Sequence, residues 1–280
     1  MYSKAIANIL HRGDLHDQLF SYMSDVELAR MSLTCVELHE AVVAYFERAY
    51  DLTRALEKYM LADFIGPFRS MQHASGAVIS GSFALKFMGR LNFSEGDLDL
   101  YVPHENAVVV AAFLESLGYS YSPRSAQEKD FELAATILQP APPSNEEEAG
   151  YRSGSPYRST IDAFTFMRDG VKVQIMTCRY GVVKAVLGFH STAVMNIITC
   201  DSGYSLYPRE TFENKRTLAS YSPSLHGIAL AKYERRGWLI VLDPVHTEVI
   251  NPRKEFGRLF RYVGDDMTRV VTIPKVYVFS

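Results

Sequence analysis

Residues 78–102, VISGSFALKFMGRLNFSEGDLDLYV, carry the pattern that decides the fold. The apolar run 77–80 is short and bounded by glycines, which is typical of a buried strand. Residues 83–89 return to helical spacing, and residues 98–102 alternate like a strand that stops at Pro103. The stretch therefore predicts a strand, a helix and a second strand in close succession.

The sequence after this stretch predicts more elements of the same core. Residues 105–117 have the spacing of a helix that ends at Gly118. Residues 161–167 and 171–177 both alternate, and the short connection Arg168-Asp169-Gly170 between them indicates a hairpin. The order strand, helix, strand, helix, hairpin predicts an α+β core, a mixed sheet flanked by helices.

The chain is expected to have three regions. Residues 1–70 are expected to form a helical region, 71–180 the α+β core, and 181–280 a C-terminal α/β extension. Within the core, residues 140–159 are rich in Pro, Ser, Gly and Glu, which predicts an exposed, mobile loop. One helix is expected to start at a cap formed by Ser24-Asp25, and another to run from 52 to 64 and end before Gly66-Pro67. Two more helices are expected at 191–199 and 225–236, and a strand is expected at the VVTIPKVYVF end.

Composition and cysteine content exclude several classes of protein. Of 280 residues, 48% are hydrophobic and 22% charged, and the formal net charge is -3, so the chain has no global excess of Lys and Arg to cover nucleic acid. Cys35, Cys178 and Cys200 are far apart and lack ligand spacing, which argues against a disulfide framework or a zinc site. No run approaches the roughly 18 apolar residues of a membrane span. We expect a cytoplasmic or nuclear protein that does not bind membranes.

Two carboxylates and a Gly-Ser pair form the candidate site. Asp97 and Asp99 are one residue apart on a predicted strand, so their side chains share a face. Adjacent carboxylates repel each other unless a cation lies between them, and oxygen ligands suit Mg²⁺. Gly81 and Ser82 end one strand and open a helix, where backbone N–H groups favour an anion such as a triphosphate.

These residues resemble the polymerase-beta type of the nucleotidyltransferase superfamily. The shared pattern is hydrophobic-Gly-Ser, a helix, and then Asp-hydrophobic-Asp, and it covers roughly residues 75–180. The resemblance implies that Gly81 and Ser82 hold the phosphates of a nucleoside triphosphate. It also implies that Asp97 and Asp99 are catalytic ligands of Mg²⁺ or Mn²⁺, in the transfer of a nucleotidyl group to an acceptor hydroxyl.

One position departs from that family. Its third carboxylate, which activates the attacking hydroxyl, corresponds here to Gln174, and an amide cannot act as a general base. Asp162, across the predicted hairpin, could substitute if the strand register places it near Asp97 and Asp99. Otherwise the core is a nucleotide-binding scaffold, that is, a catalytically inactive pseudoenzyme.

The N-terminal helical region resembles an F-box, the helical motif that docks on the Skp1-type adaptor of a ubiquitin ligase. His16-Asp17 stands where the motif usually opens with Leu-Pro, and the alternative is a helical bundle that caps the core. The matching positions are Leu19, Tyr22, Asp25, Leu28, Ser32, Leu33, Thr34, Cys35 and Leu38.

Two further groups of residues have weaker functional interpretations. Lys232, Arg235 and Arg236 beside Trp238 could contact nucleic acid, although such residues more often form a solvated helix face. His190-Ser191 with Asp201 nearby suggests a hydrolase triad, but the chain lacks the GxSxG elbow that would support one.

Overall fold

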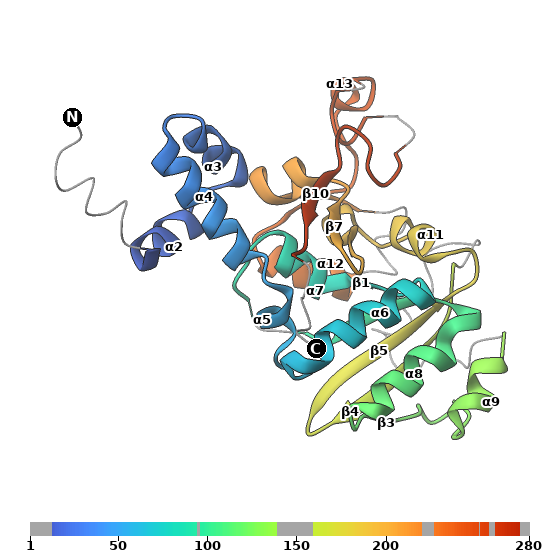
Figure 1. The fold of residues 1–280 in the computed structure, drawn as a ribbon. Coiled ribbons are helices and arrows are strands. Elements are labelled where there is room, and N and C mark those ends of the chain that lie inside the picture. Colours follow the sequence, from blue (N-terminus) through green and yellow to red (C-terminus); the bar gives the residue numbers. More distant parts are fainter. Residues whose placement is uncertain are drawn as a thin grey trace. The chain divides into compact units, whose positions relative to one another are not determined.

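The structure of the protein is a computed structural model that describes residues 13–93, 96–138, 159–219, 227–251, 253–257 and 261–274. The chain divides into two compact units, Met1–Leu52 and Thr53–Ser280, and each is described by itself. Both units are drawn in Figure 1.

The first unit consists of helices α2 (Gly13–Ser21), α3 (Asp25–Ser32) and α4 (Val36–Ala49). The expected cap at Ser24 is confirmed: its hydroxyl accepts the N–H of Glu27, and the Glu27 carboxylate accepts the N–H of Ser24. The three helices close a small core, to which α2 contributes Phe20, α3 contributes Leu28, and α4 contributes Val42 and Tyr45, one helical turn apart.

The second unit is an α+β structure, as expected. Its helices are α5 (Leu52–Leu56, at the unit boundary), η1 (Ala62–Phe64), α6 (Ile65–Ser75), α7 (Gly81–Met88), η2 (His104–Asn106), α8 (Ala107–Ser116), α9 (Phe131–Thr136), α11 (Val182–Leu187), η3 (Thr192–Val194), η4 (Arg209–Glu213), α12 (Gly227–Arg235) and α13 (His246–Val249). Its strands are β1 (Val78–Ser80), β2 (Leu98–Pro103), β3 (Ser120–Tyr121), β4 (Thr160–Arg168), β5 (Val171–Cys178), β6 (Asn196–Ile198), β7 (Ser202–Ser205), β8 (Arg216–Leu218), β9 (Leu239–Val241) and β10 (Arg269–Thr272).

Eight of these strands form one mixed sheet in the order β10-β7-β6-β1-β2-β5-β4-β3, and β8 and β9 form a separate parallel pair. Within the large sheet β2 pairs with β5 in parallel, and the other pairs are antiparallel. Strands from the C-terminal hundred residues thus complete the sheet that β1 and β2 begin.

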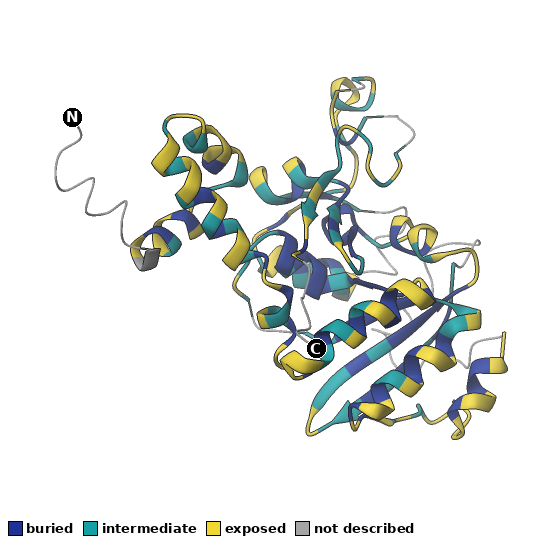
Figure 2. Cartoon of the chain, viewed as in Figure 1, coloured by how far each residue is buried: buried dark blue, intermediate teal, exposed yellow. Residues whose placement is uncertain are grey.

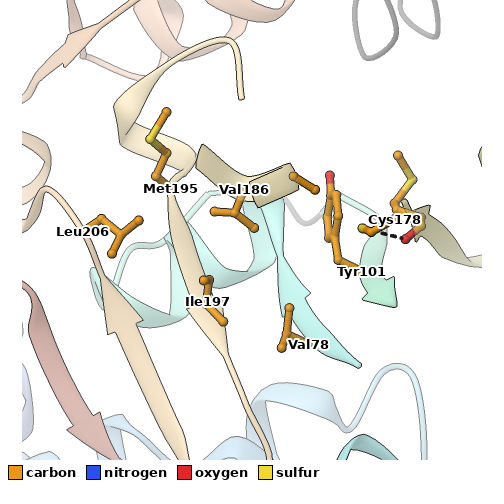
Figure 3. Close-up of a cluster of buried hydrophobic side chains, with 9 residues drawn as sticks. Val78, Tyr101, Cys178, Val186, Met195, Ile197 and Leu206 are labelled. Carbon is orange, nitrogen blue, oxygen red and sulfur yellow. Dashed lines mark hydrogen bonds between the residues drawn. The ribbon is translucent and has the colours of Figure 1, made fainter. Parts of the chain in front are cut away.

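The sheet has a buried core on each face (Figure 2). Tyr101 and Met176, which are partners across β2 and β5, pack with Val186 of α11 in the cluster that Figure 3 shows. The alternate residues Leu100 and Ile175 point to the opposite face, where α6 and α8 lie side by side (Figure 1). Asp99 precedes Tyr101 by two residues on β2 and so lies on the same face of the sheet as that cluster.

Two helix predictions are wrong. The chain does not form one helix over 52–64, because α5 stops at Leu56 and α6 begins at Ile65 and includes Gly66-Pro67 in its first turn. Proline fits there because the first turn of a helix has no use for its missing N–H. The helix expected over 191–199 is a 3₁₀ turn followed by β6, because Ile197 and Ile198 fill the sheet between β1 and β7.

Other predicted elements are confirmed. The β4–β5 hairpin turns through Asp169 (φ 49°) and Gly170 (φ 77°), the left-handed pair that a two-residue connection needs. A helix at α12 and a strand at β10 lie where the sequence indicated. The proposed mobile loop 140–159, except Ser159, lies outside the described residues, as do 220–226 and 275–280. In the described part of the chain no helix has the length and apolarity needed to cross a membrane.

We expect the loop at Asp265 to make stability depend on pH in the acid range. Burial raises the pKa of Asp265, but hydrogen bonds from Arg261 and Thr268 outweigh it and lower the pKa from 3.8 to about 2. A carboxyl group whose pKa is lowered by folding stabilises the folded state at pH values above its ordinary pKa. This stabilisation is lost as the pH falls from about 4 to 2. Asp265→Asn should therefore lower the melting temperature at pH 7, and the difference from wild type should vanish near pH 2. A constant difference across this range would contradict the assignment.

Candidate functional site

The site is built where β1 ends and α7 begins. Gly81 adopts φ +69°, and a Cβ placed on it would lie 2.5 Å from Oδ2 of Asp99. The register explains this contact, because Ser80 is the partner of Asp99 across β1 and β2. Asp99 is 8% exposed, so its carboxylate lies buried against the turn. The structure thus brings together the predicted pair, Gly81 and Asp99.

Ser82 lies against the loop that leads into β2. Its hydroxyl is 2.8 Å from where a Cβ on Gly96 would stand, and the side chain is buried. The buried Tyr59 holds this loop by donating its hydroxyl hydrogen to the Gly96 carbonyl at 2.9 Å, and its ring meets the edge of Phe83 in α7. The residue that precedes Asp97 is therefore fixed to the helix that carries Ser82.

Asp97 lies at the outer, solvent-facing part of the site. Its Oδ2 is 2.6 Å from the ammonium nitrogen of Lys172 in β5, and both side chains are more than a third exposed. The pairing of β2 with β5 puts Leu98 opposite Val173, so Lys172 arrives at the level of Asp97. An ammonium ion thus contacts the first predicted metal ligand.

Gln174 is the direct partner of Asp99 across the parallel strands. Partners across a sheet point to the same face, so the amide stands beside the carboxylate, where the resemblance expects a third acid. The Gln174 amide donates to the hydroxyl of Thr165 in β4 at 3.4 Å. The strand position predicted for Gln174 is therefore confirmed, and the residue there is neutral.

Asp162 does not replace the missing acid. Its backbone N–H donates to the hydroxyl of Thr177, the partner of Val102, so it lies about three residues, roughly 10 Å, further along the sheet than Asp99. Its carboxylate is buried in contacts with Arg124 at 2.8 Å and Gln127 at 3.1 Å. Asp162 fastens the 122–130 loop to β4 and is not part of the site.

The donor set fits one divalent cation better than two. Asp97 and Asp99 supply carboxylate oxygens, and Mg²⁺ is commonly held by one or two carboxylates together with substrate phosphates. Among the described residues no group of three or more Asp, Glu, His or Cys could enclose a metal ion. Chemically, the arrangement can bind a cation and a polyphosphate, but it places no carboxylate beside Asp99 on β5.

Sequence reasoning missed three residues that shape the site: Lys172, Gly96 and Tyr59. Lys172 could have been found, because it alternates with Gln174 and so shares its face of β5. Gly96 directly precedes Asp97 in the sequence, but the sequence does not show why a glycine is needed there. The structure does, because a Cβ at this position would lie too close to the Ser82 hydroxyl. Tyr59 gave no signal, since it lies far from the motif in sequence.

Trp238 and Arg236, two of the residues considered for nucleic-acid contact, pack within the protein. Trp238 is 2% exposed and donates its ring N–H to the Thr211 carbonyl, so no base can stack on it. The Arg236 guanidinium lies 4.0 Å from the ring centre of Phe93, in the loop before Asp97. This side chain supports the loop by stacking.

The F-box-like residues divide into buried and exposed sets. Leu28 is fully buried in the first unit, whereas Leu19, Tyr22 and Leu33 are 56%, 85% and 86% exposed. Large apolar side chains with this exposure are characteristic of docking surfaces when they lie in groups. No family model matches the chain, and no curated protein or solved structure matches it either.

Proposed function

We propose that the second unit binds a nucleoside triphosphate with a divalent cation, Mg²⁺ or Mn²⁺, at the β1–α7 turn, without transferring the nucleotidyl group. The observation that carries this proposal is the packing of the Asp99 carboxylate against Gly81, with Gln174 as its neighbour on β5. The contact between Asp99 and Gly81 places a cation ligand beside a turn that can bind phosphate. The amide of Gln174 leaves this site without a general base.

Each residue has a defined role in this proposal. Backbone N–H groups at Gly81 and Ser82 open α7 and face the phosphates, where the helix dipole adds attraction for an anion. Ser80 provides no side-chain cap to this helix, because its hydroxyl donates to the Asn196 carbonyl. Asp97 and Asp99 hold the cation. The cation, when bound, neutralises phosphate charge.

The absence of transfer follows from proton chemistry. An acceptor hydroxyl must lose its proton to attack a phosphate, and a carboxylate beside the ions would accept it. Gln174 has no basic lone pair at neutral pH, and Asp162 is committed to Arg124. Asp99 and Asp97 are occupied as ligands.

The decisive measurement is a thermal-shift screen of nucleoside triphosphates with and without Mg²⁺ or Mn²⁺. Wild type should melt at a higher temperature with nucleotide and metal together, because ligand that binds only the folded state stabilises it. Asp97→Ala/Asp99→Ala should lose this shift, while Asp266→Ala, at an exposed acid in another loop, should keep it. An equal shift in the double variant would refute the proposed site. Labelling of an acceptor by wild type with radioactive nucleotide would refute the absence of transfer.

A second candidate function concerns the first unit. The exposure of Leu19, Tyr22 and Leu33 favours docking of a Skp1-type adaptor, since buried packing within the unit does not account for these side chains. The two functions are compatible, because they use different units of the chain.

We expect a Skp1-type adaptor to capture the wild-type protein in a pulldown if the first unit acts as an F-box. Tyr22→Asp/Leu33→Asp should lose capture without loss of folding, because both side chains are exposed. Leu133→Asp, at a 59% exposed leucine of α9, is the matched control and should bind like wild type. If neither wild type nor the control binds the adaptor, the F-box-like role is wrong.

A further inference from the structure

An ion pair with Asp97 places the Lys172 ammonium group in the candidate site. We propose that its ammonium group takes the place of a second divalent ion, so that the site binds a triphosphate with one metal ion. This inference rests on the nucleotide binding proposed above and specifies how that ligand's charge is balanced.

The charge of the site supports a single ion. On the shared face of β2 and β5, Asp97 and Asp99 contribute two negative charges, Lys172 contributes one positive charge, and Gln174 is neutral. The net charge of these four side chains is therefore -1, whereas three carboxylates would give -3. A second divalent ion would also need carboxylate oxygens of its own, and on this face Gln174 stands where a third carboxylate would supply them.

The geometry gives the two aspartates different roles: Asp99 binds only the divalent ion, whereas Asp97 binds that ion through one oxygen and Lys172 through Oδ2. Asp99 is buried against Gly81, where a divalent ion could bridge it to a phosphate. Asp97 is further out, and its Oδ2 already contacts the Lys172 ammonium at 2.6 Å. An ammonium at this place can donate hydrogen bonds both to Asp97 and to a phosphate oxygen, because it carries three donors.

The exposure of the pair makes Lys172 available to a ligand. Its side chain is 36% exposed and that of Asp97 is 39% exposed, so the ion pair itself stabilises the fold little. Replacing Lys172 by methionine keeps an unbranched apolar stem and removes the ammonium group, with its charge and its hydrogen-bond donors. The variant should therefore fold, and its effect should appear in ion binding.

The test counts Mn²⁺ ions per chain by electron paramagnetic resonance, with a non-hydrolysable nucleoside triphosphate at saturation. Wild type should bind one ion. Lys172→Met should bind Mn²⁺ on the order of tenfold more tightly, because a nearby positive charge is lost at a solvent-exposed position. Lys172→Met/Gln174→Glu, which restores a third carboxylate, should bind two ions. Lys184→Met, at an exposed lysine of α11, is the control and should match wild type.

The outcomes separate this inference from the function on which it rests. Two ions in wild type, or unchanged Mn²⁺ affinity in Lys172→Met, would overturn the role of Lys172 while leaving nucleotide binding intact. A folded wild type that binds no nucleotide at all would overturn both. One ion in wild type and two in the double variant would support both.

Discussion

Gly81→Ala is expected to abolish the nucleotide-dependent rise in melting temperature. The new methyl group would stand 2.5 Å from Oδ2 of Asp99, closer than any carbon and oxygen can pack. The residue would also be held at φ +69°, which costs a non-glycine residue about 1–2 kcal/mol. Asp99 is buried and cannot swing into solvent, so either its carboxylate or the α7 turn must move. Both moves separate the proposed cation ligand from the N–H groups proposed to bind phosphate.

Gly170→Ala separates steric displacement from backbone strain. Gly170 has a similar φ of +77° in the β4–β5 turn, but a Cβ there would meet no atom within 4 Å. Both variants should lose a similar amount of stability from strain, and only Gly81→Ala should lose nucleotide binding. The readouts are the melting temperatures of each variant with and without nucleotide and Mg²⁺. Equal nucleotide shifts in the two variants would show that Asp99 need not lie against this turn.

The largest loss of stability is expected from Asp162→Ala. Arg124 and Asp162 are 8% and 7% exposed at the side chain, and the substitution leaves a guanidinium buried without its counter-charge. Breaking a buried ion pair in this way costs about 3–5 kcal/mol. Urea unfolding of the full chain should show this as a lower midpoint with little change in slope. Loss of less than about 1 kcal/mol would mean that water reaches Arg124.

Asp97→Ala is the matched comparison for that experiment. It breaks a more exposed Asp–cation pair, in which Asp97 and Lys172 are 39% and 36% exposed, and should cost less than about 1 kcal/mol. Nucleotide binding should respond in the reverse order, with loss in Asp97→Ala and retention in Asp162→Ala at temperatures where that variant is folded. This double contrast assigns one aspartate to ligand binding and the other to the fold.

The elements around the site could be predicted because short-range patterns encode them. The strand at 78–80, the helix that opens at Gly81 and the strand at 98–103 follow from local periodicity and glycine placement. The Asp169-Gly170 turn likewise specifies its hairpin from two residues. The same patterns place Asp99 on a strand beside the turn, whereas Asp97, which was expected on that strand, lies just before it.

Long-range pairing determined what the sequence could not show. Residues 196–198 have enough apolar content for a helix or a strand, and they form β6 because β1 and β7 offer partners on both sides. Whether Asp162 could reach the site also depended on the strand register, because a residue three positions further along β4 would have lain level with Asp99. The pairing of Lys172 with Asp97 required the parallel alignment of β2 with β5, which no local pattern specifies.

The two-residue turn between β4 and β5 has an evolutionary consequence. Side chains alternate along a strand, so a one-residue insertion or deletion that shifted β5 against β2 would turn Lys172 and Gln174 away together and present Val171 and Val173 in their place. Substitutions can change the charge of this face one position at a time. A change in hairpin length that shifts the register instead replaces both polar side chains by apolar ones in a single step.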